Sequence, residues 1–202
     1  MKKIASLFTI SFAVLLLAFA PAEKLQIGDT SPALKFNVQD FGGNESQLSS
    51  YAGENGLLVV FSCNTCPFVV AWENRYNEVY EAARKAGVGM VLLNSNEAFR
   101  AEEDSPENMR YHADDKAYLA PYLVDPNHKV ADAFGAKTTP HVFLFDSDMK
   151  LAYKGAIDDN HKDKDAVEHT YLKDALASIA SGGNIEVQET KALGCSIKRV
   201  KK

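Results

Sequence analysis

Two cysteines separated by two residues are the part of this sequence best suited to chemistry. They lie in the segment Cys63-Asn64-Thr65-Cys66, which one residue, Ser62, separates from the apolar run 57–61. A cysteine thiolate is the nucleophile of thiol–disulfide exchange, and two thiols at this spacing can form a reversible disulfide. The segment therefore predicts redox chemistry with Cys63 and Cys66 as catalytic residues and with Asn64 and Thr65 as modulators of their potential.

The elements on either side of the pair predict a strand-to-helix junction. The continuous apolar run 57–61 is typical of a central strand covered on both faces. After Pro67, apolar residues recur at spacings of three and four, which predicts a helix that ends before Gly87. Because N–H groups at a helix N-terminus stabilise a thiolate, we expect Cys63 to be the exposed thiol of low pKa. Cys66, one turn further on, is expected to be the shielded thiol that resolves a mixed disulfide.

Other roles for a close cysteine pair fit the sequence less well. A four-cysteine zinc site needs a second pair, whereas the chain has three cysteines in all. A structural disulfide across two residues closes too small a loop to add much stability. The five histidines form no i, i+4 pair, so we expect neither a metal nor another cofactor.

The remaining pattern predicts one α/β domain over residues 23–202, with a C-terminal tail from about residue 184. Two strand–helix units followed by a hairpin and a last helix favour a mixed sheet with helices on both faces. Three helical segments are expected. The charge-rich segment 96–118 has Ser105-Pro106 as its helix start signal, and it is followed by a short helix over 127–134 and a last helix over 166–180. Strands are expected at 88–93, 122–124, 142–145 and 151–153, the last two as a hairpin, and short extended pieces over 25–51.

Residues 1–22 have the pattern of a secretory signal peptide. Lys2 and Lys3 precede an uncharged apolar run, and Ala20-Pro21-Ala22 resembles a cleavage site. We expect cleavage before Glu23, a periplasmic or secreted location, and no stable membrane insertion of the mature chain. With only three cysteines, such an exported domain is not a disulfide-stapled scaffold, so a close pair is there for chemistry.

Composition narrows the range of partners. The formal net charge is −5 and becomes −7 when Lys2 and Lys3 are removed with the signal peptide. An acidic chain without a basic stripe argues against nucleic acid and anionic membranes as partners. A hydrophobic content of 46% is typical of a packed globule.

A second constellation, Thr138-Thr139-Pro140-His141, precedes the predicted strand 142–145. The order strand, C-x-x-C, helix, strand, helix, Thr-Pro, hairpin, helix resembles the thioredoxin superfamily. The nearest similarity is to its exported branch with redoxin or AhpC/TSA-type domains. The similar segments cover most of residues 25–198 and are Ile27-Gly28-Asp29-x-x-Pro32, Leu48-Ser49-x-Tyr51-x-Gly53, Asn94-Ser95-Asn96, Asp104-Ser105-Pro106-x-x-Met109, Asp125, Phe134-Gly135-Ala136, Gly155-x-Ile157-Asp158-Asp159 and Gly194-Cys195-Ser196-Ile197-Lys198.

The resemblance implies a thioredoxin-like three-layer α/β/α sandwich with a mixed central sheet and an N-terminal β extension. It implies that Pro140 is a cis-proline facing the cysteines, and that the Thr139 backbone pairs with an extended substrate segment. It further implies a thiol–disulfide oxidoreductase that acts in redox homeostasis on exported proteins or small thiols, together with a redox partner protein. His141 would then lie near the sulfurs, either as a cation that favours thiolate or as a plain polar neighbour.

The sequence also departs from the pattern it resembles. Ser62 stands where many thioredoxins have tryptophan, and Leu57 stands where they bury an acid that accepts a proton during resolution. Glu73 is a candidate substitute for that acid, although a solvated helix position is the simpler expectation. The third cysteine, Cys195, could be a third redox partner, form an intermolecular bridge, or pack as a small apolar side chain.

Two other functions use similar residues. A thiol peroxidase with antioxidant activity would fit the AhpC/TSA resemblance, but its P-x-x-x-T-x-x-C motif is absent before both Cys63 and Cys66. A copper chaperone on the same fold would bind Cu(I) through the two thiolates and through His141 or His161. The cysteine spacing in such chaperones is wider than in this sequence.

Overall fold

The structure is a computed structural model that describes residues 25–200. The signal peptide predicted for residues 1–22 lies outside the described residues. Within the described part of the chain, no helix combines the length and the apolar character needed to cross a membrane.

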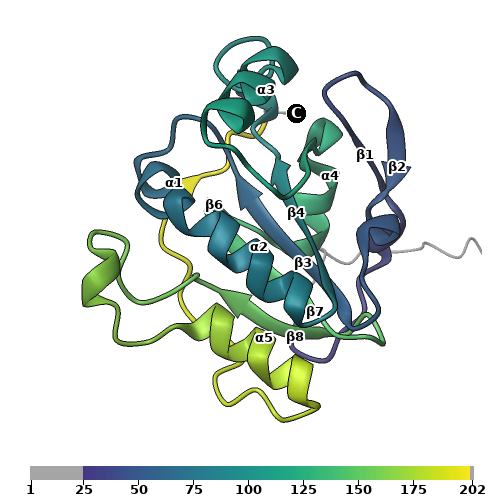
Figure 1. Ribbon diagram of the computed structural model, residues 1–202. Helices are drawn as coiled ribbons and strands as arrows, with labels where there is room; N and C mark the ends of the chain where they lie inside the picture. The colour runs from purple at the N-terminus through teal and green to yellow at the C-terminus, as the bar shows by residue number, and fades with distance from the viewer. Residues whose placement is uncertain (1–24, 201–202) are drawn as a thin grey trace, which may run out of the picture.

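A seven-stranded mixed sheet forms the centre of the molecule (Figure 1), with the strand order β2-β1-β5-β4-β3-β7-β8. The central strands β3, β4 and β5 are mutually parallel. On both sides of them, each further strand pairs antiparallel with its neighbour. β1 and β2 extend the sheet beyond β5, which confirms the predicted N-terminal β extension. The strands are β1 (Asn37–Gln39), β2 (Glu45–Gln47), β3 (Gly56–Ser62), β4 (Val88–Asn94), β5 (Tyr122–Val124), β7 (His141–Phe145) and β8 (Leu151–Gly155).

The sheet is covered on both faces, and this explains the continuous apolar run that becomes β3. Successive side chains of a strand point to opposite faces. Leu58 and Val60 therefore enter one core, whereas Leu57, Val59 and Phe61 enter the other. All five side chains are fully buried.

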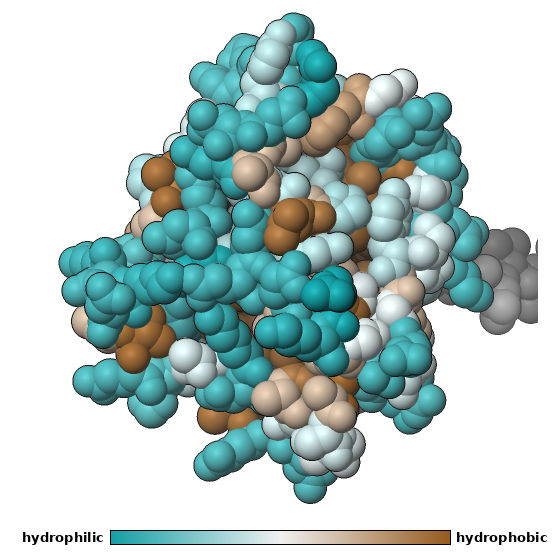
Figure 2. Space-filling view, viewed as in Figure 1, coloured by the Kyte–Doolittle hydropathy of each residue, from teal (hydrophilic) through white to brown (hydrophobic). Residues whose placement is uncertain are grey.

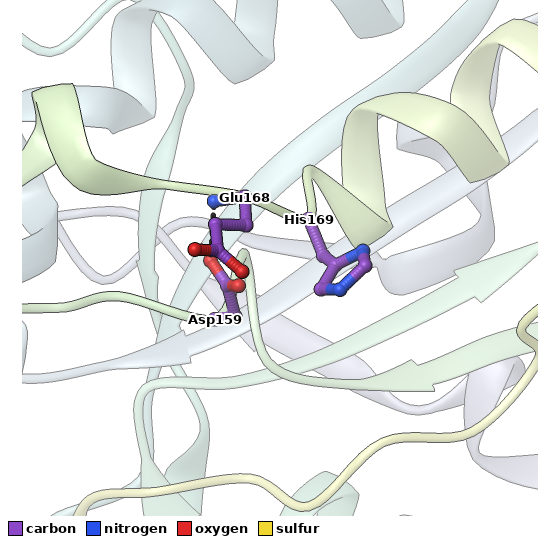
Figure 3. A group of neighbouring side chains, drawn as sticks. All are labelled: Asp159, Glu168 and His169. Atoms are coloured by element: carbon purple, nitrogen blue, oxygen red, sulfur yellow. Dashed lines mark hydrogen bonds between the residues drawn. The ribbon is translucent and has the colours of Figure 1, made fainter.

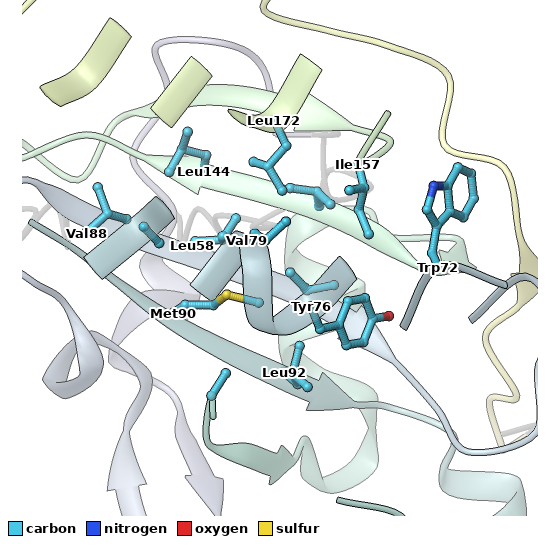
Figure 4. Close-up of a cluster of buried hydrophobic side chains, with 14 of the residues drawn as sticks. Leu58, Trp72, Tyr76, Val79, Val88, Met90, Leu92, Leu144, Ile157 and Leu172 are labelled. Carbon is cyan, nitrogen blue, oxygen red and sulfur yellow. The ribbon is translucent and has the colours of Figure 1, made fainter. Parts of the chain in front are cut away.

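Helices form the two outer layers. Figure 4 shows the first core, where Tyr76 and Val79 of α2 and Leu172 of α5 pack on Leu58 and Met90 of the sheet. The helix α4 and the 3-10 helix η1 cover the opposite face. The three-layer α/β/α prediction is thus confirmed. The helices are α1 (Pro67–Trp72), α2 (Tyr76–Lys85), α3 (Pro106–Asp115), α4 (Lys129–Phe134) and α5 (Tyr171–Ser181), with 3-10 turns η1 (Pro32–Lys35), η2 (Leu48–Tyr51), η3 (Glu73–Arg75), η4 (Glu97–Phe99), η5 (Pro126–His128) and η6 (Lys164–Ala166).

Two helices differ from the prediction. The helix expected from Pro67 to Gly87 is divided into α1 and α2 by the 3-10 turn η3. The last helix begins at Tyr171 rather than near residue 166. The segment before it is held against a neighbouring loop instead, because the Glu168 N–H donates to the Asp159 carboxylate at 3.1 Å.

The molecular surface agrees with the acidic, polar composition. Figure 2 shows a mainly hydrophilic face on which apolar residues form separate patches rather than one broad area. Exposed large apolar side chains in the described residues include Val70 on α1 and Leu193 in the C-terminal tail. Both lie within four residues of a cysteine in the sequence.

The C-terminal tail after α5 is ordered along a long path that returns to the sheet. It forms the short strand β9 (Cys195–Ser196), which pairs antiparallel with β6 (Thr138–Thr139) in a separate two-stranded sheet. In Figure 1 this tail runs past α1 and β6. No local pattern in the sequence predicts this pairing.

Candidate active site

Cys66 occupies the N-cap position of α1, and Pro67 is the first helical residue. Proline suits this position because an N–H at the first helical residue would have no partner inside the helix, so its absence costs no hydrogen bond. The Cys66 side chain closes no regular capping hydrogen bond, but the nearby N–H of Val69 acts on its sulfur. The same sulfur lies 3.1 Å from the carbonyl oxygen of Thr139, to which its protonated form donates.

Cys63 lies between the end of β3 and this helix. Its sulfur lies 3.1 Å from the side-chain oxygen of Thr139. Both cysteines are free thiols, and their side chains belong to the first core. Cys63 is 2% exposed and Cys66 is 4% exposed, so the predicted exposure of Cys63 was wrong, whereas Cys66 is shielded as predicted.

The acidity of the two thiols is also the reverse of the prediction. Interaction with the Cys63 thiol lowers the pKa of Cys66 to about 4, and the Val69 N–H contributes in the same direction. The same interaction, together with burial and the charge of Asp104, raises the pKa of Cys63. The helix start adds to this difference: because α1 begins at Pro67, the N–H of Val69 in its first turn acts on Cys66.

Thr139 and Pro140 lie against the cysteine pair, as the sequence led us to expect. The Thr139–Pro140 peptide bond is cis. Thr139 contacts both sulfurs, through its hydroxyl and through its carbonyl. Its backbone edge, which we expected to be open to a substrate, is occupied by the chain itself because Thr139 pairs with Cys195.

The two residues between the cysteines have different surroundings. Thr65 is exposed, whereas Asn64 is buried and tied to the segment before α3. The Asn64 N–H donates to the Asp104 carboxylate at 2.9 Å, and its side-chain amide donates to the Glu103 carbonyl at 2.7 Å. Tyr122 donates to the Asn64 side-chain oxygen at 2.9 Å. Asn64 therefore fixes the loop that carries the pair.

His141 does not act on the cysteines as a cation. Its ring lies against Phe143 at a centroid distance of 4.5 Å and lines a cavity of about 270 Å³ together with Phe134 and Lys154. Burial lowers the pKa of His141 to about 4, so the ring is neutral at pH 7. Of the two alternatives considered for His141, the positive imidazole is therefore not supported, because β7 carries the ring into this cavity beside Phe143.

Glu73 is buried rather than solvated, contrary to the simpler expectation. Its carboxylate lies 2.8 Å from the His112 ring nitrogen and accepts a hydrogen bond from Tyr118 at 2.9 Å. Burial alone would raise the pKa of Glu73, but these partners outweigh it and lower the pKa. Leu57, where thioredoxins have an acid, faces the second core, whereas the cysteines face the first.

An ion pair that the sequence did not reveal supports the helix behind the cysteines. Asp158 is buried and accepts hydrogen bonds from Trp72 at 2.8 Å and from Arg75 at 2.9 Å. Trp72 ends α1 and Arg75 ends η3, so one carboxylate anchors both elements. A lone tryptophan in the apolar stripe gave no indication that its ring N–H needs a partner.

One cluster of metal-ligand type lies away from the cysteines. Among residues 25–200, Asp159, Glu168 and His169 have ligand atoms within 4.8 Å of one another, and all three are exposed (Figure 3). Asp159 accepts the backbone N–H of Glu168, which gives the carboxylate a part in holding the loop. Within the described chain, neither His141 nor His161 joins the cysteines in such a cluster, and this removes support for the copper site considered above.

Comparisons with known proteins agree with this arrangement. Residues 27–154 match the AhpC/TSA family. A curated relative, the thiol-disulfide oxidoreductase ResA of Geobacillus thermodenitrificans strain NG80-2, is 26% identical over 136 residues, which are 66% of this chain and 71% of the relative. A hypothetical protein of Sinorhizobium meliloti 1021 has a similar crystal structure, with a TM-score of 0.79 and 30% identity over 89% of this chain and 98% of the other.

A more distant structure shows the fold alone. Peroxidoxin BcpB of Mycobacterium tuberculosis superposes with a TM-score of 0.59 at 17% identity, over 78% of this chain and 97% of its own. The mixed sheet, the cysteine pair and the adjoining Thr139–Pro140 segment define the class of thioredoxin-like redox proteins. Within that class, the chain belongs to the AhpC/TSA family.

Proposed function

We propose that this protein is a thiol–disulfide oxidoreductase that uses Cys63 and Cys66 on disulfides of exported proteins or small thiols. The observation that carries the proposal is the interaction of the two thiols at the start of α1, which gives Cys66 a strongly lowered pKa. A thiolate beside a second thiol is the arrangement that disulfide exchange requires. Membership of the AhpC/TSA family and similarity to a relative named as a thiol-disulfide oxidoreductase support redox chemistry.

In the proposed reaction, the Cys66 thiolate attacks one sulfur of a substrate disulfide. A bond forms between the two sulfurs as the substrate S–S bond breaks, and the departing thiolate takes a proton from solvent. Cys63 then attacks the Cys66 sulfur and expels the second substrate thiolate, which receives the Cys63 proton. The substrate gains two electrons, and the two protein thiols lose them as they form the Cys63–Cys66 disulfide. The reverse sequence of steps oxidises a substrate.

Access to the sulfurs sets a condition on the substrate. Because both cysteines are nearly buried and Thr139 is paired with Cys195, a protein substrate that pairs with Thr139 must first displace β9. A small disulfide needs only to reach the Cys66 sulfur. Exposed Val70, on α1 and four residues after Cys66, offers an apolar contact for a substrate. We infer that the tail moves during turnover of protein substrates.

The test is turnover of oxidised glutathione and of insulin by the mature chain with dithiothreitol as reductant. The wild type should accelerate both reactions, and Cys66→Ser and Cys63→Ser should each lose about a hundredfold or more. Arg84→Ala, an exposed change near the end of α2, is the control and should retain the rate. Wild-type protein without activity on either disulfide would refute the proposal.

A second measurement separates this function from the peroxidase alternative. Hydrogen peroxide consumption by the reduced wild type should be much slower than its exchange with disulfides, since the peroxide-orienting motif is absent. Faster consumption of peroxide than of disulfide would favour a thiol peroxidase instead.

Export completes the proposal. We place the activity in the periplasm or the extracellular space, because the first 22 residues have the signal-peptide pattern. Fractionation of cells that express the full chain, with mass spectrometry of its N-terminus, should find a form that begins at Glu23 outside the cytoplasm. A chain that retains Met1 in the cytoplasm would contradict it.

A further inference from the structure

The C-terminal tail is held on both sides of Cys195. Before it, the tail lies along β8, where the Thr190 N–H donates to the Lys154 carbonyl at 3.0 Å. After it, the N–H of Ile197 donates to the Lys137 carbonyl at 3.0 Å. The Ile197 side chain is buried in the second core. The position of Cys195 is therefore set by anchors that flank it closely.

Between these anchors, the tail touches the segment that contacts both catalytic sulfurs. Cys195 is the direct partner of Thr139 in the β6–β9 pairing. At Gly194 the backbones approach so closely that an added Cβ would lie 2.2 Å from the Thr139 carbonyl oxygen. The sulfur of Cys66 approaches the same oxygen at 3.1 Å. Cys195 and Cys66 thus both contact Thr139.

The side chain of Cys195 turns inward from this strand. It is half-buried and packs against the first core, to which Cys63 and Cys66 both belong. Its thiol interacts with the Cys66 sulfur, and the backbone N–H of Phe68 acts on it as well. Burial and the Cys66 sulfur raise the pKa of Cys195, so its proton stays in place while Cys66 is a thiolate. Cys66 consequently has a thiol neighbour on two sides.

We propose that Cys195 is a third redox-active cysteine, which resolves mixed disulfides on Cys66 through a Cys66–Cys195 disulfide. This inference rests on the proposed exchange activity of the Cys63–Cys66 pair. It favours the first of the three roles considered for Cys195, because a half-buried thiol tied beside Cys66 is poorly placed to bridge to another molecule.

The exchange steps balance without a further oxidant. When a substrate sulfur is bound to Cys66, the Cys195 sulfur attacks the Cys66 sulfur, and the substrate leaves as a thiol with the Cys195 proton. Two protein thiols are oxidised, and one substrate disulfide is reduced to two thiols. Cys63 can next attack the Cys66 sulfur, which forms Cys63–Cys66 and returns a proton to Cys195. The disulfide thereby passes between the tail and the C-x-x-C pair.

A chemical oxidation experiment tests the pairing independently of substrate turnover. The full mature chain with Cys63→Ser is reduced and treated with diamide, which oxidises neighbouring thiols to disulfides, and non-reduced peptides are identified by mass spectrometry. We expect a Cys66–Cys195 disulfide as the main product, and none in the matched Cys63→Ser/Cys195→Ser variant. Cys63→Ala replaces Cys63→Ser if circular dichroism shows that the serine variant is unfolded. Free Cys66 and Cys195 thiols after this treatment would overturn the inference.

Oxidised glutathione then tests the resolving role. The Cys63→Ser/Cys195→Ser variant should keep a glutathione adduct on Cys66, whereas Cys63→Ser should hold about tenfold less, because Cys195 expels it. Equal adducts in the two variants would overturn the role of Cys195. If the wild type leaves all its thiols unreacted with glutathione disulfide, the proposed function fails, and the diamide result still decides whether Cys66 and Cys195 pair.

Discussion

The sulfur of Cys66 lies 3.1 Å from the carbonyl oxygen of Thr139, and Thr139 pairs with Cys195 across the strands β6 and β9. One backbone carbonyl therefore lies where two cysteines distant in the sequence meet. Interaction with the Cys63 thiol, together with the Val69 N–H in the first turn of α1, lowers the pKa of Cys66 and favours this sulfur as the thiolate of the pair.

The acidity of Cys66 should depend on its partner at position 63. Because interaction with the Cys63 thiol is the largest cause of the low pKa of Cys66, Cys63→Ala should raise that pKa from about 4 toward the ordinary value. Cys63→Ser keeps a hydroxyl donor and should raise it less. The measurement is the ultraviolet absorbance of the thiolate against pH, with Cys195→Ser in the background of both variants. An unchanged Cys66 midpoint in Cys63→Ala would contradict the assignment.

Removing one partner of the buried ion pair behind α1 should destabilise the fold strongly. Arg75→Ala leaves the Asp158 carboxylate buried with only part of its hydrogen bonds, which costs about 3–5 kcal/mol. Arg84→Ala breaks an exposed pair with Glu81 and should change the free energy of unfolding by less than about 1 kcal/mol. Urea denaturation of the two variants measures both values. Similar losses in the two would mean that the Arg75 pair contributes no more than a surface contact.

The neutral, buried His141 should make the fold less stable in mild acid. Its pKa of about 4 lies below the ordinary value of 6.5, so the unfolded chain binds a proton at higher pH than the folded protein. Its contribution to stability is therefore complete above pH 6.5 and falls as the pH decreases toward 4. His141→Phe should flatten this part of the stability profile in urea titrations and leave disulfide exchange at pH 7 within about twofold.

The same replacement at exposed His169 is the control for that experiment, since its ring stacks on Tyr171 at the surface. His169→Phe should retain the acid-dependent loss of stability that His141→Phe removes, because His141 is intact in this variant. A loss of exchange activity in His141→Phe of tenfold or so, with the fold intact, would restore the modulating role expected from the sequence.

Adding a methyl group at position 194 should separate the tail from the site. The Cβ of Gly194→Ala would meet the Thr139 carbonyl oxygen at 2.2 Å, so β9 must shift away from β6. We expect the alkylation of Cys195 to become about tenfold faster than in the wild type. In Gly183→Ala the new Cβ meets the Ser181 hydroxyl at 3.3 Å and the Ser178 carbonyl oxygen at 3.8 Å, away from Cys195 in the sequence, and the alkylation rate should not change. Equal rates in both variants would show that the pairing does not shield Cys195.

Local patterns in the sequence were sufficient to predict the elements that carry the cysteines. The runs 57–61 and 88–93 became β3 and β4 with the parallel pairing expected of a strand–helix–strand unit. The Ser105-Pro106 signal marked the start of α3, where the Ser105 hydroxyl accepts the Asn108 N–H. Such features depend on neighbours within a few residues, and these are visible in a single sequence.

The details of the site depend on relationships that a single sequence does not contain. A helix start displaced by one or two residues decides which sulfur lies beside the free N–H groups, and boundaries at that precision are not predictable from periodicity. Glu73 was expected in water because its partner His112 is distant in the sequence, and the burial of Asp158 beside Arg75 also depends on a distant contact. The contact between Cys195 and Thr139 likewise depends on the path of the whole tail.

That path has a consequence for how the protein is made. A ribosome synthesises the chain from its N-terminus, so Cys63, Cys66 and Thr139 are all present before Cys195 emerges. The central sheet can therefore form around an uncovered cysteine pair, and β9 closes over it only when synthesis is nearly finished. A nascent or truncated chain that ends before residue 195 presents the pair without the strand that covers Thr139 in the complete protein.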